Sequence, residues 1–294
     1  MMKNLINRFY VENEDIHIYL HQLIANKNIK EVRRVLRHKR LRGLIDINYK
    51  EGIFLRTACL NNDLKIIKLL LLDRKIGMNA NFEDNYSSDF NNPFIVSVLK
   101  GNFKTILFFL NNEEINKKIN LIEKDCLSLG LAVWGNHINI AKELFKRIER
   151  IEKEQFIKFF ISAFQNIKEE KADKKMLVLI MKELEKRKIE ILELEEEGRT
   201  ILDMAMELNN IDVLEAFLPY FIKNKAYVEQ SSLYALKLKR FNCVNYLSLE
   251  KNISIPYKID MFSCQEIKDF LYKLELYKKY TNNKESKKTT IIKI

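Results

Sequence analysis

Glycine and proline are scarce in this chain of 294 residues, which contains 7 Gly and 3 Pro. Both residue types interrupt regular backbone structure, glycine through its conformational freedom and proline through its missing N–H group. A β-sandwich or β-barrel needs many such interruptions, so the composition argues against these folds. It favours a mostly helical chain instead, and a hydrophobic content of 47% is enough for a large core.

Cysteine is also scarce, and its spacing excludes the common zinc motifs. The four cysteines, Cys59, Cys126, Cys243 and Cys264, are scattered without a C-x-x-C pair or another zinc-like spacing. We therefore interpret them as reduced thiols of a cytosolic protein, with Cys59 and Cys243 as small core residues.

Histidine occurs four times, and only one pair has a spacing that suits a metal ion. His17 and His21 lie four residues apart and share an expected helix face, but the segment lacks the glutamate of an H-E-x-x-H zinc site. Neither a metal ion nor another cofactor is predicted.

Catalytic motifs are missing as well. The sequence has no G-x-S-x-G nucleophile elbow, no G-x-x-x-x-G-K-[ST] phosphate loop and no G-x-G-x-x-G dinucleotide motif. Carboxylates are abundant, but charged side chains on solvated helix faces are expected and indicate no acid–base pair. We predict that the protein is not an enzyme.

No stretch of the sequence approaches the roughly 18 apolar residues that cross a bilayer. The amino-terminal segment 1–15 also lacks the long apolar centre and small-residue cleavage site of a secretory signal. We therefore predict a cytoplasmic protein without a membrane span. Secretion into a host cell by a route that uses no signal peptide remains an alternative.

Repetition is the strongest positive feature of the sequence. The stretch IFLRTACLNNDLKIIKLLL at 53–71 recurs as NPFIVSVLKGNFKTILFFL at 92–110 and as LSLGLAVWGNHINIAKELF at 127–145. Each copy contains a small residue (Ala58, Ser97 or Ala132), then a polar turn, then a helical stripe of large apolar residues. A unit of this size cannot bury its apolar face alone, so we expect successive copies to stack.

The repeated motif resembles the ankyrin-repeat family in divergent form. Its clearest carrier is the segment 198–205, in which Thr200, Leu202 and Ala205 match the Thr, Leu and Ala of T-P-L-H-x-A. Pro93 matches the proline, while Gly101-Asn102 and Asn136-His137 match the Gly-His turn. His21 takes the family's His position, so the resemblance implies structural roles for His21 and His137. The resemblance implies an all-α fold, an ankyrin-like α-solenoid of stacked helix-turn-helix repeats.

The resemblance also suggests how the chain is organised. We expect an N-terminal segment at 1–15, a solenoid of about seven divergent units at 16–250, a capping helix region at 251–277 and a Lys-rich disordered tail at 278–294. One elongated domain is expected, because each repeat contacts only its neighbours.

Close packing between repeats would explain the small residues, since a bulky side chain there would push the helices apart. We predict such packing at Ala58, Ser97, Ala132, Ala205 and Ala235. Large residues are expected to fill the core between second helices: Leu69, Leu70, Phe108, Phe109, Leu110, Leu144, Phe145, Phe217 and Leu218.

The resemblance implies a concave binding groove, formed by the hairpin tips and the exposed side of the first helices. We predict a non-catalytic protein-binding scaffold that acts as a monomer, and the sequence does not identify its partner. The candidate contact residues are Tyr49, Lys50, Asn61, Phe82, Glu83, Tyr86, Lys100 and Trp134.

The formal net charge is +11 at pH 7, and a basic run stands out. Its members are Arg33, Arg34, Arg37, Lys39, Arg40 and Arg42. One interpretation is the polar outer face of a terminal capping repeat. The alternative is a site for an anionic surface or a nucleic acid. Nucleic acid is the less favoured partner, because no aromatic set for base stacking accompanies the run.

Overall fold

The computed structural model describes residues 15–73, 92–168, 173–190, 195–196 and 198–291. These residues are mostly helical, which confirms the all-α class. Within them, the strands are limited to β1 (Glu195–Glu196) and β2 (Arg199–Thr200), which pair antiparallel with Glu196 opposite Arg199. Packing divides the chain into two compact units, the first ending at Ile151 and the second beginning at Glu152.

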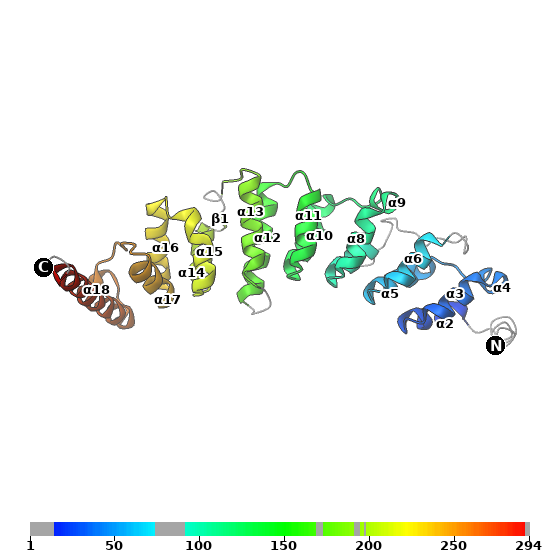
Figure 1. The fold of residues 1–294 in the computed structure, drawn as a ribbon, viewed down its shortest axis with the longest axis horizontal. Coiled ribbons are helices and arrows are strands. Elements are labelled where there is room, and N and C mark those ends of the chain that lie inside the picture. The colour runs from blue at the N-terminus through cyan, green and yellow to red at the C-terminus, as the bar shows by residue number, and fades with distance from the viewer. Residues whose placement is uncertain (1–14, 74–91, 169–172, 191–194, 197, 292–294) are drawn as a thin grey trace. The chain divides into compact units, whose positions relative to one another are not determined.

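The described part of the first unit contains four helix pairs, each made of a first helix, a tight turn and a second helix (Figure 1). The pairs are α2 (Ile16–Ala25) with α3 (Ile29–Arg37), α5 (Tyr49–Leu60) with α6 (Leu64–Leu72), α7 (Pro93–Leu99) with α8 (Phe103–Asn111), and α10 (Glu123–Trp134) with α11 (Ile138–Arg147). Two short helices, α4 (Lys39–Arg42) and α9 (Glu113–Asn116), follow α3 and α8.

The pairs of the first unit stack in chain order. Helix α2 packs on α5, α5 on α7 and α7 on α10, while α3 packs on α6 and α8 on α11. First and second helices thus form two layers with the core between them. The rings of Phe54, Phe109 and Phe145 are almost completely buried there, and burying each such side chain stabilises the fold by roughly 1.5–3 kcal/mol.

The turn inside each pair uses one recurring backbone geometry. In the α5–α6 turn, Asn62 has a left-handed φ of 53°, and the N–H of Asp63 donates to the carbonyl of Ala58 at 3.0 Å. This six-to-one hydrogen bond is the Schellman ending, which satisfies a carbonyl that the helix leaves unpaired. Asp63 then begins α6, because its carboxylate accepts hydrogen bonds from the N–H groups of Lys65 and Ile66, both at 3.1 Å.

The other turns of the first unit repeat this geometry. Lys27, Gly101 and Asn136 take the left-handed position, with φ values of 55°, 70° and 54°. In three of these turns the six-to-one hydrogen bond is accepted by the carbonyl of a small residue expected from the sequence: Ala58, Ser97 or Ala132. All three residues are fully buried. Ala205 and Ala235 of the second unit are fully buried too, which confirms the prediction for all five positions.

Successive turns are joined by hydrogen bonds from one pair to the next. The side-chain amide of Asn61 donates to the carbonyls of Ile24 (3.3 Å) and Ala25 (3.1 Å), at the end of the preceding first helix. Asn102 donates in the same way to the carbonyl of Cys59. The terminal carbonyls of one first helix are therefore capped by the following pair.

His137 makes the corresponding contact in the last pair of the first unit. Its Nε2–H donates to the carbonyl of Leu99 at 3.2 Å. Its ring lies against two glycines, since a Cβ added to Gly101 would be 2.6 Å from His137 Cε1 and one on Gly135 would be 2.5 Å from Nε2. The left-handed φ of Gly101 also favours glycine at this position.

The second unit contains three helix pairs among its described residues, followed by a long terminal helix. The pairs are α12 (Lys153–Lys168) with α13 (Lys175–Lys186), α14 (Ile201–Glu207) with α15 (Ile211–Phe221), and α16 (Lys225–Lys237) with α17 (Phe241–Asn245). The π-helix η3 (Tyr246–Glu250), the 3-10 helix η4 (Ile259–Met261) and α18 (Gln265–Ile291) complete the unit.

The T-x-L-x-x-A segment begins the second pair of this unit for a local physical reason. Thr200 is the N-cap of α14, where its hydroxyl accepts a hydrogen bond from the N–H of Asp203 at 3.2 Å. The carboxylate of Asp203 accepts from the N–H of Thr200 in return, at 2.8 Å. This reciprocal capping box satisfies two N–H groups that the first turn leaves unpaired. The motif therefore sets where α14 begins.

Two sequence-based expectations differ from the structure. Phe108 is half-buried and does not belong to the fully buried core, whereas the other eight predicted core residues are buried. Helix α18 continues to Ile291, through most of the segment 278–294 for which we expected disorder. This segment contains neither glycine nor proline, and its many Lys residues are compatible with a helix.

Replacement of Lys27 by glycine should stabilise the first unit. Lys27 is exposed in a left-handed turn, where a side chain is unfavourable and glycine is the usual residue. We expect Lys27→Gly to raise the free energy of unfolding by about 1 kcal/mol, measured from urea-unfolding midpoints. The matched control Lys30→Gly, on the exposed side of α3, should lower it by about 1 kcal/mol. A loss of stability in Lys27→Gly would contradict the turn geometry.

Candidate functional site

The solvent-facing side of the first helices in the first unit carries large apolar side chains. Leu60 (44% exposed) and Trp134 (54% exposed) occupy equivalent positions, each being the last residue of its first helix. Ile18 on α2 is 54% exposed. The half-buried residues Ile53, Ile95, Leu99, Leu127 and Leu131 lie on the same sides of their helices. We call these eight residues the apolar face.

Helical spacing explains why these residues share one face. Ile53 lies two turns before Leu60 on α5, and Leu127 lies two turns before Trp134 on α10, so each pair is presented on the same side of its helix. The first helices pack side by side in chain order, which brings their outward sides together. Contiguous exposed apolar surface of this kind marks interaction sites more often than chance exposure does.

A polar contact between two first helices lies within this layer. The Nε2 atom of His21 on α2 is 2.9 Å from the hydroxyl oxygen of Thr57 on α5. This hydrogen bond joins the first two pairs and gives His21 the structural role expected from the sequence. Asn61 is likewise occupied, because its amide caps the end of α2. Asn61 was a candidate contact residue, and the structure gives its side chain an internal partner.

Tyr49 and Lys50 lie at the start of α5, where three consecutive residues have left-handed φ angles. The Tyr49 ring stacks on the His17 ring with their centroids 4.3 Å apart, and Lys50 Nζ lies 5.2 Å from the Tyr49 centroid. His17 is itself fixed, since its Nε2 accepts a hydrogen bond from the N–H of Asp46 at 2.9 Å. Tyr49 is therefore half-buried in a packed cluster, while Lys50 is exposed.

The remaining candidate contact residues have different outcomes. Lys100 is exposed in the α7–α8 turn, and Trp134 is exposed at the end of α10. Phe82, Glu83 and Tyr86 lie outside the described residues. The structure therefore brings only part of the predicted set near the apolar face. Five members of this face were not among the contact residues considered from the sequence: Ile18, Ile95, Leu99, Leu127 and Leu131.

The predicted basic run is exposed but locally paired. The Arg34 guanidinium donates to Glu31 in the preceding turn of α3, and Arg37 donates to Asp73 at 2.8 Å. Arg33, Lys39 and Arg40 are exposed, and Arg42 is half-buried. Exposed ion pairs contribute only about 0–1 kcal/mol each, but they neutralise part of the local charge.

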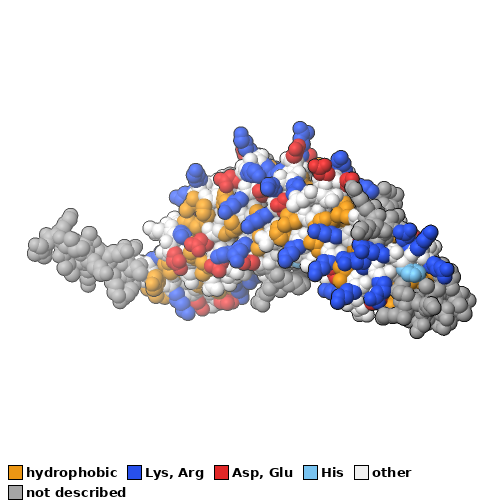
Figure 2. Space-filling model, turned by 45° about the vertical axis from the view of Figure 1, so that its right-hand side comes forward, with side chains coloured by type: hydrophobic (Ala, Val, Ile, Leu, Met, Phe, Trp, Pro, Cys, Tyr) orange, Lys and Arg blue, Asp and Glu red, His pale blue; other side chains and the backbone are white. Residues whose placement is uncertain are grey.

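A wider set of cations extends over the second helices of the first unit. These exposed residues occupy equivalent positions three or four residues apart on their helices. We call them the basic face: Lys30, Arg33, Arg37, Lys65, Lys68, Lys104, Lys142 and Lys146. The carboxylate of Glu143, also on α11, pairs with Arg147 at 2.8 Å. Figure 2 shows Lys and Arg side chains gathered over the N-terminal part of the molecule.

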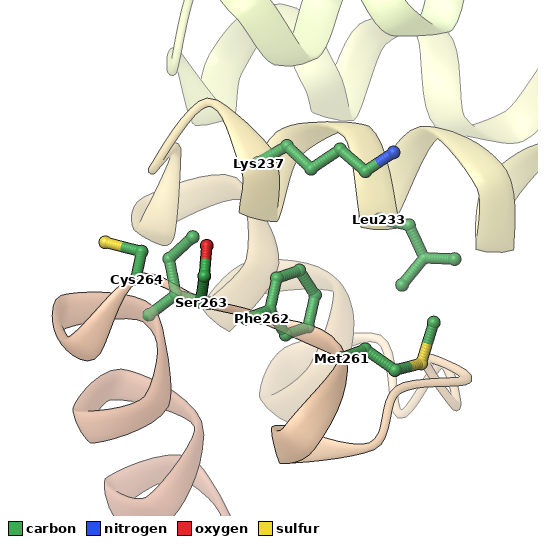
Figure 3. Close-up of a pocket in the computed structure, with 7 residues that line it drawn as sticks. Leu233, Lys237, Met261, Phe262, Ser263 and Cys264 are labelled. Carbon is green, nitrogen blue, oxygen red and sulfur yellow. The ribbon is translucent and has the colours of Figure 1, made fainter.

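The second unit has a separate small hollow beside α16. Leu233 and Lys237 of α16 lie opposite Met261, Phe262, Ser263 and Cys264, with Ile267 completing the lining. In Figure 3 Leu233, Met261 and Phe262 approach one another, while the sulfur of Cys264 points away from them. The hollow is open to solvent and has one charged side chain, that of Lys237, so it offers little for a specific polar ligand.

Metal-binding geometry is not found in the described ranges, where no group of three or more His, Cys, Asp or Glu side chains converges. Among the helices that the structure describes, none is both long enough and apolar enough to span a membrane.

The cysteines allow a direct test of the predicted packing. Burial raises the pKa of Cys59 to about 12 and that of Cys243 to about 11. Cys126 is buried as well, whereas Cys264 is partly exposed. Because the thiolate is the reactive form, iodoacetamide at about pH 8 should modify Cys264 first and the others only after unfolding. Mass spectrometry of timed labelling, with and without guanidinium, checks this order. Equal labelling rates for Cys59 and Cys264 in the folded protein would contradict it.

In comparisons with known proteins, no family model matches the chain and no curated protein matches its sequence.

Proposed function

We propose that the chain is a non-catalytic protein-binding module built from ankyrin-like helix pairs. In this proposal the apolar face of the first unit holds a protein partner, and Lys50 and Lys100 lie at its polar edge. The observation that carries the proposal is the exposure of Trp134 (54%) and Leu60 (44%) at equivalent helix ends.

Three features support an ankyrin-like arrangement. Successive pairs stack in chain order in the first unit, the turns repeat a left-handed residue, and Thr200 caps α14 where the family motif begins. The contact of His137 with Gly101 in the preceding turn adds a further link. Such stacks expose long surfaces whose side chains vary without disturbing the core.

Energetics favour a protein partner for the apolar face. Removing apolar surface from water contributes roughly 25 cal/mol per Å², and a nucleic acid backbone offers little apolar surface in exchange. Tryptophan is also among the residues most enriched at binding hot spots, where truncation weakens binding by about 2 kcal/mol or more. Because Trp134 and Leu60 belong to helices, little backbone freedom remains to be lost on binding.

Serine at Trp134 and Leu60 together should weaken partner binding without unfolding the protein. We expect affinity capture from the native cell to recover a specific protein on the unaltered chain, and at least about tenfold less of it on the double variant. Quantitative mass spectrometry of the captured protein measures the difference, and thermal unfolding should remain nearly unchanged.

The matched control for this experiment is Ile222→Ser, which removes a 49% exposed apolar residue from the second unit. This control should retain the partner. Equal loss in both variants would contradict the apolar face as the binding site. Loss of capture at high salt, with no effect of the double variant, would favour the alternative of an anionic partner on the basic run Arg33 to Arg42.

A further inference from the structure

The second helices of the first unit carry a hollow that the proposed protein-binding face does not use. It lies between α6 and α8, has a volume of about 350 Å³, and is lined by Lys68, Lys104, Leu107, Phe108, Asn111 and Asn112. All six residues belong to the first unit, and both lysines are members of the basic face. The hollow is open to solvent, so a segment lying across the two helices has access to it.

Apolar side chains form one part of this hollow. Phe108 and Leu107 are half-buried, whereas the neighbouring Phe109 is fully buried in the core. Lys68 Nζ lies 5.2 Å from the centroid of the Phe108 ring, a cation–π contact that holds the ammonium beside the apolar surface. An apolar group placed on Leu107 and Phe108 would therefore also lie close to a fixed positive charge.

The charges around the hollow are distributed unevenly. None of its six lining residues is acidic, and Lys65 on the same side of α6 adds a third exposed cation nearby. Lys104 lies in the first turn of α8, whereas Asn111 and Asn112 lie at its end. Glu113 and Glu114 follow Asn112 and are exposed. The positive potential is thus concentrated toward the beginning of α8, away from these two carboxylates.

We propose that this hollow binds an acidic peptide segment that contains one apolar side chain. The apolar side chain packs on Leu107 and Phe108, while neighbouring carboxylates pair with Lys68 and Lys104. Asn111 and Asn112 line the other end. Their Oδ1 atoms already accept hydrogen bonds from Arg147 and from the N–H of Ile115, so their side-chain N–H groups are the donors for the peptide backbone. The proposal does not depend on the apolar face of the first helices, because it concerns the opposite helix layer.

The combination of apolar surface and lysines favours a peptide over other anions. A nucleic acid duplex contacts cations mainly through its phosphates and would leave the Leu107–Phe108 surface uncovered. A bilayer attracts basic residues roughly in proportion to their number near the surface, so it would use the basic face evenly. A peptide can place one side chain in the hollow and carboxylates at its edge.

A designed probe peptide tests the proposal. The probe is a fluorescein-labelled peptide of about twelve residues, long enough to cross two packed helices, with glutamates on both sides of one leucine. We expect the full chain to bind it in a fluorescence-anisotropy titration. Replacing the leucine by serine should weaken binding by about fivefold, since one apolar side chain is removed from contact.

The variant Lys68→Glu with Lys104→Glu should weaken probe binding by about tenfold or more, because two attractive contacts become repulsive. The matched control is Lys142→Glu with Lys146→Glu, which changes the charge equally on the same basic face but outside the hollow. The control should weaken binding by no more than about threefold. Thermal unfolding of both variants verifies folding, and Lys68→Gln with Lys104→Gln replaces the first variant if its unfolding temperature falls.

Several results would overturn the proposal. Equal weakening in the two charge variants would indicate a diffuse electrostatic attraction, and equal binding of the leucine and serine peptides would exclude an apolar contact. Tighter binding of a DNA duplex or of phosphatidylserine vesicles than of the probe would favour those ligands. Trp134→Ser with Leu60→Ser should leave probe binding unchanged, so failure of the probe alone leaves the protein-binding proposal for the apolar face intact.

Discussion

The stack depends on hydrogen bonds between neighbouring helix pairs. In each case, a side chain of one pair caps the end of the first helix in the preceding pair. A helix leaves its last carbonyls without hydrogen-bond donors of its own. Here the next helix pair supplies donors for several of these carbonyls. Asn61, Asn102 and His137 all donate side-chain hydrogen bonds to carbonyls near the end of the preceding first helix. These hydrogen bonds form only when the turns of neighbouring pairs lie close together, so only small side chains fit between the pairs near the turns. Ala58, Ser97 and Ala132 are fully buried for this reason.

This packing restricts the residues of the turns and of the inner sides of the helices. It does not restrict the solvent-facing sides of the first and second helices. In the first unit these sides have different chemistry: the first helices expose Leu60 and Trp134, while the second helices expose lysines such as Lys68 and Lys104. Because neither set enters the core, each can be changed with little effect on folding. Two binding surfaces with separate ligands are therefore compatible with one framework.

The sequence predicted the helices and most of the core, because the period of apolar residues and the small residues are local signals. It misplaced Phe108, since two adjacent phenylalanines in a continuous apolar run do not reveal which of them faces the core. Asn61 appeared to be a surface residue because its partner, the end of α2, is distant in the sequence. The lysines of the basic face were missed for a similar reason: they come from four helices, whereas only the run at 33–42, which contains Arg33 and Arg37, was conspicuous.

The basic run and the two lysines of the hollow between α6 and α8 differ in the contacts that their cations already make. In the run, Arg34 and Arg37 already contact Glu31 and Asp73, so a new ligand would have to compete with these carboxylates. Lys68 instead lies over the half-buried Phe108 ring. A bound apolar side chain would exclude water there, and a charge pair gains strength when water is displaced from around it. We therefore propose Lys68 and Lys104, which lie beside an apolar surface, as a stronger site for an anionic ligand than the basic run.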